Sequence, residues 1–236
     1  MVGFSQTNQI IFSHNPFSMP QGKIENLDFK KPLDIIPRII PKNKKINILI
    51  KKNIIKDKKF FIAASHQSMF ETFYLQTIFN SPVFILKKEL LLIPVFGWYL
   101  KKIGSISIKR NKVTRDNLNF FENISKTIAK SKRPIIIFPQ GTRVLPDERP
   151  PFKKGVGRIY EELNILCQPL AINSGYVWPK KGIKVPNKTI TISILKPIET
   201  NLESKNFLEV LELNFFEEHN VDFLLRLNNS FSTTAF

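Results

Sequence analysis

The chain has 236 residues, of which 42% are hydrophobic and 23% are charged. This length and apolar content can bury a substantial core, which excludes a disordered chain and favours one α/β domain with extensions. The formal net charge of +17 favours an anionic partner, either nucleic acid, an anionic membrane surface or a phosphorylated substrate, although a general enrichment in lysine can account for much of it.

Residues 1–45 are predicted to form an irregular arm with at most short helices, because five prolines interrupt its short apolar pieces. We expect no secretory signal, because the N-terminus has neither a basic region nor a long apolar run. We expect no transmembrane span, because no stretch reaches about 18 uninterrupted apolar residues. Two strands, at residues 46–55 and 58–65, are predicted to follow the arm and to be separated by a basic turn.

The second of these strands ends in a polar cluster, and a segment with helical periodicity resumes at Met69. His66 lies in this junction, at the carboxyl end of a strand, where open α/β sheets place catalytic groups. Glu71 follows five residues later, and the two side chains meet more easily if His66 precedes the helix, because five helical steps would separate them by roughly 140°. Ser68 and Glu71 also form a capping box, so Glu71 is either a helix-capping residue or the partner of His66.

After a first helix at 71–80, the sequence predicts a strand at 82–86, a short helix that Pro94 disturbs, and a strand at 105–110. Leu90–Leu100 is the most hydrophobic stretch of the chain. We interpret it as core, with contact to an acyl chain or a membrane as the alternative. Residues 111–132 have apolar side chains at helical spacing and predict an amphipathic helix.

A buried strand at residues 133–138 then opens into the turn PQGTR. Gly141 lets the backbone approach a ligand closely, and the Arg143 guanidinium can fork onto phosphate oxygens. Arg110 ends its own strand in the same way. Two strand-end arginines beside a strand-end histidine therefore indicate an anion-binding site.

Residues 201–236 differ in charge from the rest of the chain. They contain two basic and six acidic residues, a net charge of −4, which leaves +21 for residues 1–200. We predict a separate, acidic, helical extension at this end of the chain.

Four short motifs occur in order: HQSMFE, GSISIKR, FPQGTR and QPLAINSG. With the connecting sequence LKKELLLIPVFGWYLKKIG, they resemble the motifs of the glycerolipid acyltransferase superfamily, most closely the bacterial 1-acylglycerol-3-phosphate acyltransferases. The resemblance covers about residues 55–200. It implies an α/β fold with a mixed, largely parallel sheet flanked by helices, in a single acyltransferase domain that we place at residues 46–200.

The resemblance also implies a reaction. An acyl chain would pass from acyl-CoA or acyl carrier protein, as co-substrate, to the sn-2 hydroxyl of lysophosphatidic acid. His66 would be the general base for that hydroxyl, and Glu71 would orient the imidazole. No metal or other cofactor is expected, because the single cysteine and three widely separated histidines offer no ligand set.

The remaining motifs would bind the substrates. The residues implied to bind the glycerol phosphate are Lys88, Arg110, Gln140, Gly141, Thr142 and Arg143. The residues implied to line the acyl or donor pocket are Pro169, Leu170, Ala171 and Ile172. For this last set, a buried strand entered after a proline is the alternative interpretation.

Two residues depart from the family's usual motifs. Glu71 stands in place of Asp and is one methylene longer, and Gln140 stands in place of Glu and loses a charge. Either change could alter acceptor preference or rate. The apolar N-terminal helix common in the family also has no convincing counterpart in the arm.

The basic surface is expected to hold the protein on anionic lipid, as a peripheral protein on the cytoplasmic face of a membrane. Alternatives to the main prediction are acyl transfer to glycerol 3-phosphate or another lysolipid, and a catalytically inactive lipid-binding homologue. Nucleic-acid binding is not predicted, because the sequence has no RNA-binding aromatic signature and no recognition-helix pattern.

Overall fold

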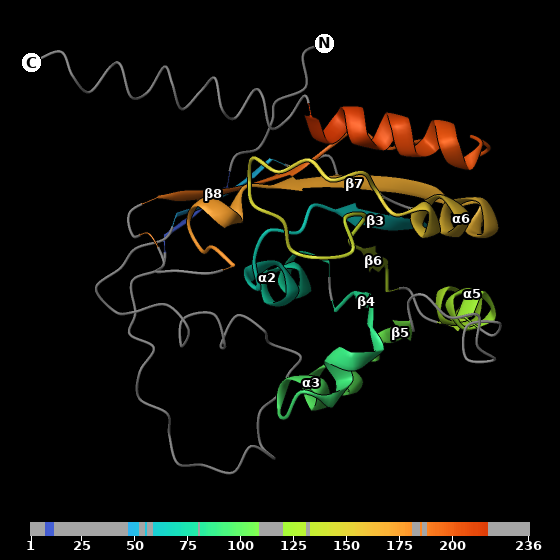
Figure 1. Ribbon diagram of the computed structural model, residues 1–236, viewed down its shortest axis with the longest axis horizontal. Coiled ribbons are helices and arrows are strands. Elements are labelled where there is room, and N and C mark those ends of the chain that lie inside the picture. Colours follow the sequence, from blue (N-terminus) through green and yellow to red (C-terminus); the bar gives the residue numbers. More distant parts are fainter. Residues whose placement is uncertain are drawn as a thin grey trace, which may run out of the picture.

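The computed structural model describes residues 8–11, 47–51, 55, 59–79, 81–108, 120–130, 133–180, 185 and 188–216. These residues form a sheet of eight strands in the order β1-β2-β8-β7-β3-β6-β4-β5 (Figure 1). The strands are β1 (Asn8–Ile11), β2 (Asn47–Lys51), β3 (Phe60–Ala64), β4 (Val83–Lys87), β5 (Ile106–Ile108), β6 (Ile135–Ile137), β7 (Leu166–Ile172) and β8 (Thr189–Ile194). Only the pairs β1–β2 and β7–β8 are antiparallel, so the prediction of a mixed, largely parallel sheet is confirmed.

Helices cover both faces of this sheet. They are α2 (Phe70–Ile78), η3 (Lys88–Leu92), α3 (Phe96–Lys102), α5 (Phe120–Lys130), α6 (Lys154–Leu163), η4 (Ser174–Tyr176) and the last described helix at residues 204–216. The alternation of side chains along β3 explains the two layers, because Ile62 and Ala64 pack with α2 and α3 while Phe61 and Ala63 pack with α5 and α6. A strand that is buried on both faces reads as a continuous apolar run, as β3 does.

The structure changes the prediction for the arm and describes part of the helix predicted at 111–132. The arm at residues 1–45 is not wholly irregular, because Asn8–Ile11 pairs with β2; the rest of the arm lies outside the described residues. The helix predicted at 111–132 is described from Phe120 to Lys130, and residues 109–119 also lie outside the described part.

The helix predicted in the acidic extension is present at residues 204–216, where it packs against the core, and residues 217–236 lie outside the described part. Its residues Phe207, Leu211 and Phe215 are buried in the core cluster that also contains α6. The Phe207 ring stacks on Tyr160 of α6, with ring centroids 3.9 Å apart and an interplanar angle of 5°. The acidic residues Glu209 and Glu212 lie on the exposed face, so the charge pattern marked the outer surface of a core helix.

Leu90–Leu100 is only partly core, contrary to the favoured interpretation. Tyr99 and Leu100 are buried and Leu90 is half-buried, whereas four apolar side chains in the same stretch are exposed. The stretch runs from η3 into α3, and its exposed side chains gather at the turn between them, where residues 92–95 are all exposed.

Candidate active site

His66 follows β3 at the carboxyl end of the parallel strands. The ring stacks on Phe138, which follows β6, with centroids 3.9 Å apart and an interplanar angle of 18°. The Val144 backbone N–H donates to the His66 carbonyl oxygen at 2.9 Å. Because β3 and β6 are neighbours in the sheet, the two strand exits that the sequence singled out form one site.

Glu71 is fully buried and accepts hydrogen bonds from four groups. Its Oε2 lies 3.0 Å from His66 Nδ1 and 2.9 Å from the Ser68 backbone nitrogen. Its Oε1 accepts from the backbone N–H groups of Ser68 at 2.9 Å and Gln67 at 3.3 Å, and from the Ser174 hydroxyl. A buried carboxylate needs such partners to stay ionised and oriented.

Both interpretations of Glu71 therefore hold together. The carboxylate caps the backbone before α2, as the capping box predicts, and it contacts the imidazole as well. A capping box places the N-cap at Ser68, but the helix begins one residue later, with Met69 as its N-cap. Ser68 Oγ accepts a hydrogen bond from the Phe70 N–H at 3.1 Å. The extra methylene of Glu71 is accommodated because the loop before α2 folds back onto its side chain.

Ser174 is a site residue that the sequence reasoning did not assign. It begins η4, just after β7, and its hydroxyl donates to Glu71 Oε1. Its neighbour Gly175 donates its N–H to Gln67 Oε1 at 3.0 Å. The sequence signal for Ser174 was the polar NSG that ends the fourth motif. This signal points to the site only because β7 lies beside β3, the strand that His66 follows.

The residues of the fourth motif proper lie in the middle of the sheet. Pro169, Leu170, Ala171 and Ile172 belong to β7, are buried, and pair with β3 on one side or β8 on the other. None of them is among the residues that line the groove beside His66. Their placement agrees with the alternative interpretation, a buried strand.

A groove with a volume of about 840 Å³ opens beside His66. Four basic residues line it: Lys87, Arg143, Lys153 and Lys154. Its apolar wall includes Phe84, Leu90, Phe96, Leu100 and Phe138. The groove thus joins a cationic part, at the N-terminus of α6, to an apolar part under η3 and α3, which suits an amphipathic anion.

A family model described as Acyltransferase matches residues 45–173, which is more than half of the chain. The chain belongs to the acyltransferase family. A 1-acyl-sn-glycerol-3-phosphate acyltransferase of Pseudomonas aeruginosa is 31% identical over 161 residues, a match that covers 68% of this chain and 61% of the relative. The enzyme of that name from Saccharomyces cerevisiae is 29% identical, with 68% of this chain and 54% of the relative covered.

The fold has a counterpart among solved structures. The crystal structure of the 1-acyl-sn-glycerophosphate acyltransferase PlsC from Thermotoga maritima matches with a TM-score of 0.60 and 22% identity, covering 73% of this chain and 70% of that chain. This likeness concerns the fold. The chain spans about three fifths of the length of the Pseudomonas relative and about half of the length of the Saccharomyces relative.

The structure brings together some of the residues implied to bind the glycerol phosphate. Gly141, Thr142 and Arg143 of the acyltransferase line the groove, and Gly141 adopts the left-handed conformation with φ of +70°. Lys88 is exposed at the start of η3, and its neighbour Lys87 lines the groove instead. Arg110 lies outside the described residues.

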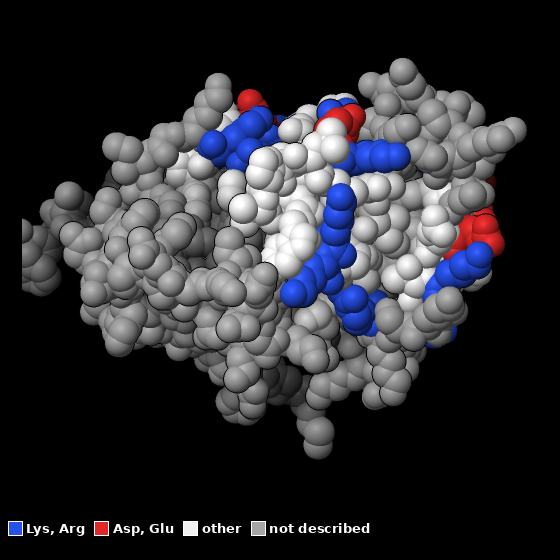
Figure 2. Space-filling view, turned by 90° about the horizontal axis from the view of Figure 1, so that it is seen from below, with Lys and Arg blue, Asp and Glu red and all other residues white. Residues whose placement is uncertain are grey.

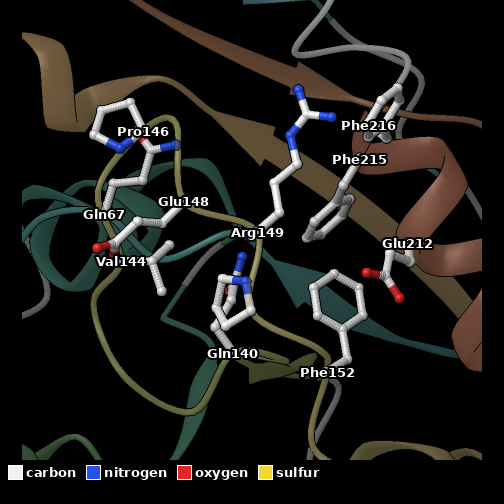
Figure 3. A pocket seen from close by; sticks show the side chains of 11 residues that line it. Gln67, Gln140, Val144, Pro146, Glu148, Arg149, Phe152, Glu212, Phe215 and Phe216 are labelled. Carbon is white, nitrogen blue, oxygen red and sulfur yellow. The ribbon is translucent and has the colours of Figure 1, made fainter.

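Gln140 lies on the far side of its loop from the groove. It lines a second, small cavity of about 50 Å³, together with Phe152 and with Phe215 of the last described helix (Figure 3). Its Oε1 is buried and has no hydrogen-bond partner among the described residues. Two carboxylates, Glu148 and Glu212, line the same cavity, so a neutral amide at position 140 avoids adding a third negative charge there.

The described helices of this chain include none that is both long and apolar enough to cross a membrane.

Proposed function

We propose that this acyltransferase moves an acyl chain from an acyl thioester, of coenzyme A or acyl carrier protein, to the sn-2 hydroxyl of 1-acylglycerol 3-phosphate. The observation that carries the proposal is the 3.0 Å contact between His66 Nδ1 and the fully buried Glu71 carboxylate at the mouth of a cationic and apolar groove. The names of the relatives support the choice of acceptor.

The contact with Glu71 assigns a role to each imidazole nitrogen. A carboxylate accepts only, so Nδ1 carries the proton and Nε2 has a lone pair for the substrate. In the proposed reaction, Nε2 takes the proton of the acceptor hydroxyl as its oxygen attacks the thioester carbonyl. The tetrahedral intermediate then expels the thiolate, which receives the same proton from the imidazolium, so no acyl-enzyme forms.

The groove residues suit the two ends of the acceptor. Arg143, Lys153 and Lys154 supply positive charge, and α6 begins at this point, where the positive end of its helix dipole favours an anion. The phosphate would bind here, and the acyl chain would lie along the apolar wall that includes Leu90 and Phe96. This arrangement puts the glycerol between the two ends, beside His66.

The proposal is tested by measuring thiol release from acyl-CoA and from acyl carrier protein in the presence of lysophosphatidic acid, for the parent and His66→Ala. Activity in the parent and a loss of at least about a hundredfold in the variant are expected. Cys167, the single cysteine, should not obscure the readout, because it is buried and burial raises the pKa of its thiol well above the usual value.

Glycerol 3-phosphate serves as the competing acceptor in the same assay. A higher kcat/KM with glycerol 3-phosphate than with lysophosphatidic acid would contradict the proposed acceptor. Full activity of His66→Ala, or a silent parent with both donors, would contradict the proposed reaction and leave a lipid-binding relative of the family.

A further inference from the structure

The turn from η3 into α3, which we call the η3–α3 corner (residues 88–102), exposes a group of large apolar side chains. The exposed fractions are 81% for Leu92, 45% for Ile93, 66% for Val95 and 42% for Trp98. They lie within seven consecutive residues and so form one patch. Single exposed apolar residues are ordinary, but a contiguous group of this kind marks an interaction surface.

The corner is tightly built, so the patch has a fixed shape. A Cβ added at Gly97 would overlap the backbone carbonyl of Leu91, which shows that η3 and α3 meet backbone to backbone. Val95, the N-cap of α3, has a φ of +61°, a strained conformation for a β-branched residue that only a well-packed neighbourhood maintains.

Basic residues border the patch on both sides. Lys87 and Lys88 precede it and Lys101 and Lys102 follow it, while Glu89 is the single acidic residue of this stretch, so residues 87–102 have a net charge of +3. Lys102 Nζ lies 4.8 Å from the centre of the Trp98 ring. Figure 2, which views the molecule from the side of α3, shows lysine and arginine atoms around uncharged surface, with few acidic atoms.

We propose that the η3–α3 corner docks on an anionic lipid surface and places the mouth of the groove against it. Leu92, Ile93 and Val95 would enter the acyl boundary and Trp98 would lie at the level of the headgroups, while the lysines would contact anionic headgroups. Charge complementarity favours this partner over a second copy of the chain, because two copies of a basic patch repel each other.

The docking itself is independent of the proposed function, but the delivery of substrate from the lipid surface to His66 rests on it. The inner side of the same corner lines the groove through Leu90, Phe96 and Leu100. An acyl chain leaving the lipid surface would therefore stay in contact with apolar side chains from the patch to His66. This route needs no membrane-spanning element.

The test is sedimentation of the full chain with phosphatidylcholine vesicles that either contain or lack phosphatidylglycerol. The patch variant combines Leu92→Ser with Val95→Ser, and the charge variant combines Lys101→Gln with Lys102→Gln. We expect the patch variant to bind anionic vesicles about tenfold or more weakly, and the charge variant to lose about fivefold per lysine. Matched controls come from the last described helix, where Leu213 is 60% exposed: Leu213→Ser and Lys205→Gln should bind like the parent.

Activity assays separate docking from catalysis. The patch variant should keep the parent kcat/KM with a short-chain, monomeric lysophosphatidic acid and should lose activity with a long-chain acceptor embedded in vesicles. Vesicle binding is measured without an acyl donor, so it decides the docking proposal even if the proposed reaction fails.

Three results would overturn the proposal. The first is a parent that binds neither kind of vesicle, or binds both equally. The second is a patch variant that binds as tightly as the parent. The third is a parent dimer that the patch variant dissociates, seen by analytical ultracentrifugation, which would identify a second copy as the partner of this surface.

Discussion

The active-site loop (residues 65–71) and the η3–α3 corner border the same groove but use their side chains in opposite ways. In the loop, polar groups are buried: Ser68 and Glu71 are fully enclosed and Gln67 is 2% exposed. In the corner, apolar groups are exposed, with Leu92 at 81%. The comparison separates a region that encloses its polar groups, where we propose the chemistry, from a region that exposes its apolar groups, where we propose contact with lipid.

The difference has an energetic basis. A buried carboxylate without partners would cost several kcal/mol, and the four donors around Glu71 offset that cost while fixing the position of His66. The exposed side chains of the corner contribute little to folding, because they leave most of their surface in water. Substitutions in the loop should therefore lower the rate of catalysis, and substitutions at the base of the corner should lower the stability of the fold. Substitutions at the tip of the corner should change neither the stability nor the catalytic step.

The largest effect is expected for Glu71→Gln in the loop. A Gln side chain can keep the Oε1 hydrogen bonds, but its amide group would donate to His66 Nδ1 and force the other tautomer, in which Nε2 carries the proton and cannot act as a base. We expect kcat to fall by roughly a hundredfold or more. The check is steady-state kinetics, with circular dichroism to confirm folding; a variant with more than half of the parent kcat would contradict the assigned tautomer.

The next effect is expected at the base of the corner, for Gly97→Ala. The new Cβ would overlap the Leu91 carbonyl, and relieving that overlap should lower the free energy of unfolding by about 1–3 kcal/mol. Thermal and urea unfolding measure this change. Gly155→Ala is the matched control, because an added Cβ there has no heavy atom within 4 Å and lies in helix α6, where Ala is the better helix former.

A smaller effect is expected for Ser174→Ala. The change removes one donor to Glu71 Oε1, so the carboxylate holds His66 less firmly; we expect kcat to fall about tenfold with little change in the KM for the acceptor. Ser65→Ala is the control: this buried hydroxyl bonds the Ile172 backbone and not Glu71, so its loss should lower stability and spare kcat. Equal kcat losses in both variants would assign Ser174 a purely structural role.

The smallest effect is expected at the tip of the corner. Leu92→Ser should change the free energy of unfolding by less than about 0.5 kcal/mol, because the side chain is 81% exposed in the folded protein. Urea unfolding monitored by tryptophan fluorescence measures it. A loss above about 2 kcal/mol would mean that this side chain packs in solution and would remove the contrast between loop and corner.

Local patterns predicted most of the central elements. The apolar runs at 60–64, 83–87 and 135–137 form β3, β4 and β6, because a parallel strand buried on both faces needs an unbroken apolar sequence. His66 and Glu71 were found for a similar reason: Glu71 follows His66 by five positions, and their meeting depends only on where helix α2 begins.

Long-range packing decided what the pattern left open. The Leu90–Leu100 stretch reads as uniformly apolar, and only its fold into η3 and α3 determines which side chains face the groove and which face solvent. Lys153 and Lys154 line the groove because α6 begins beside the loop after β6, where the Lys153 N–H donates to the Pro139 carbonyl at 3.0 Å.

The sequence by itself predicted that a histidine and a carboxylate meet at a strand exit, because their spacing is local. The tertiary structure alone decided what holds the carboxylate in place, since Ser174 reaches Glu71 across 103 residues of chain. That contact exists because β7 pairs with β3, and strand order in a sheet depends on interactions between distant segments that no local pattern specifies.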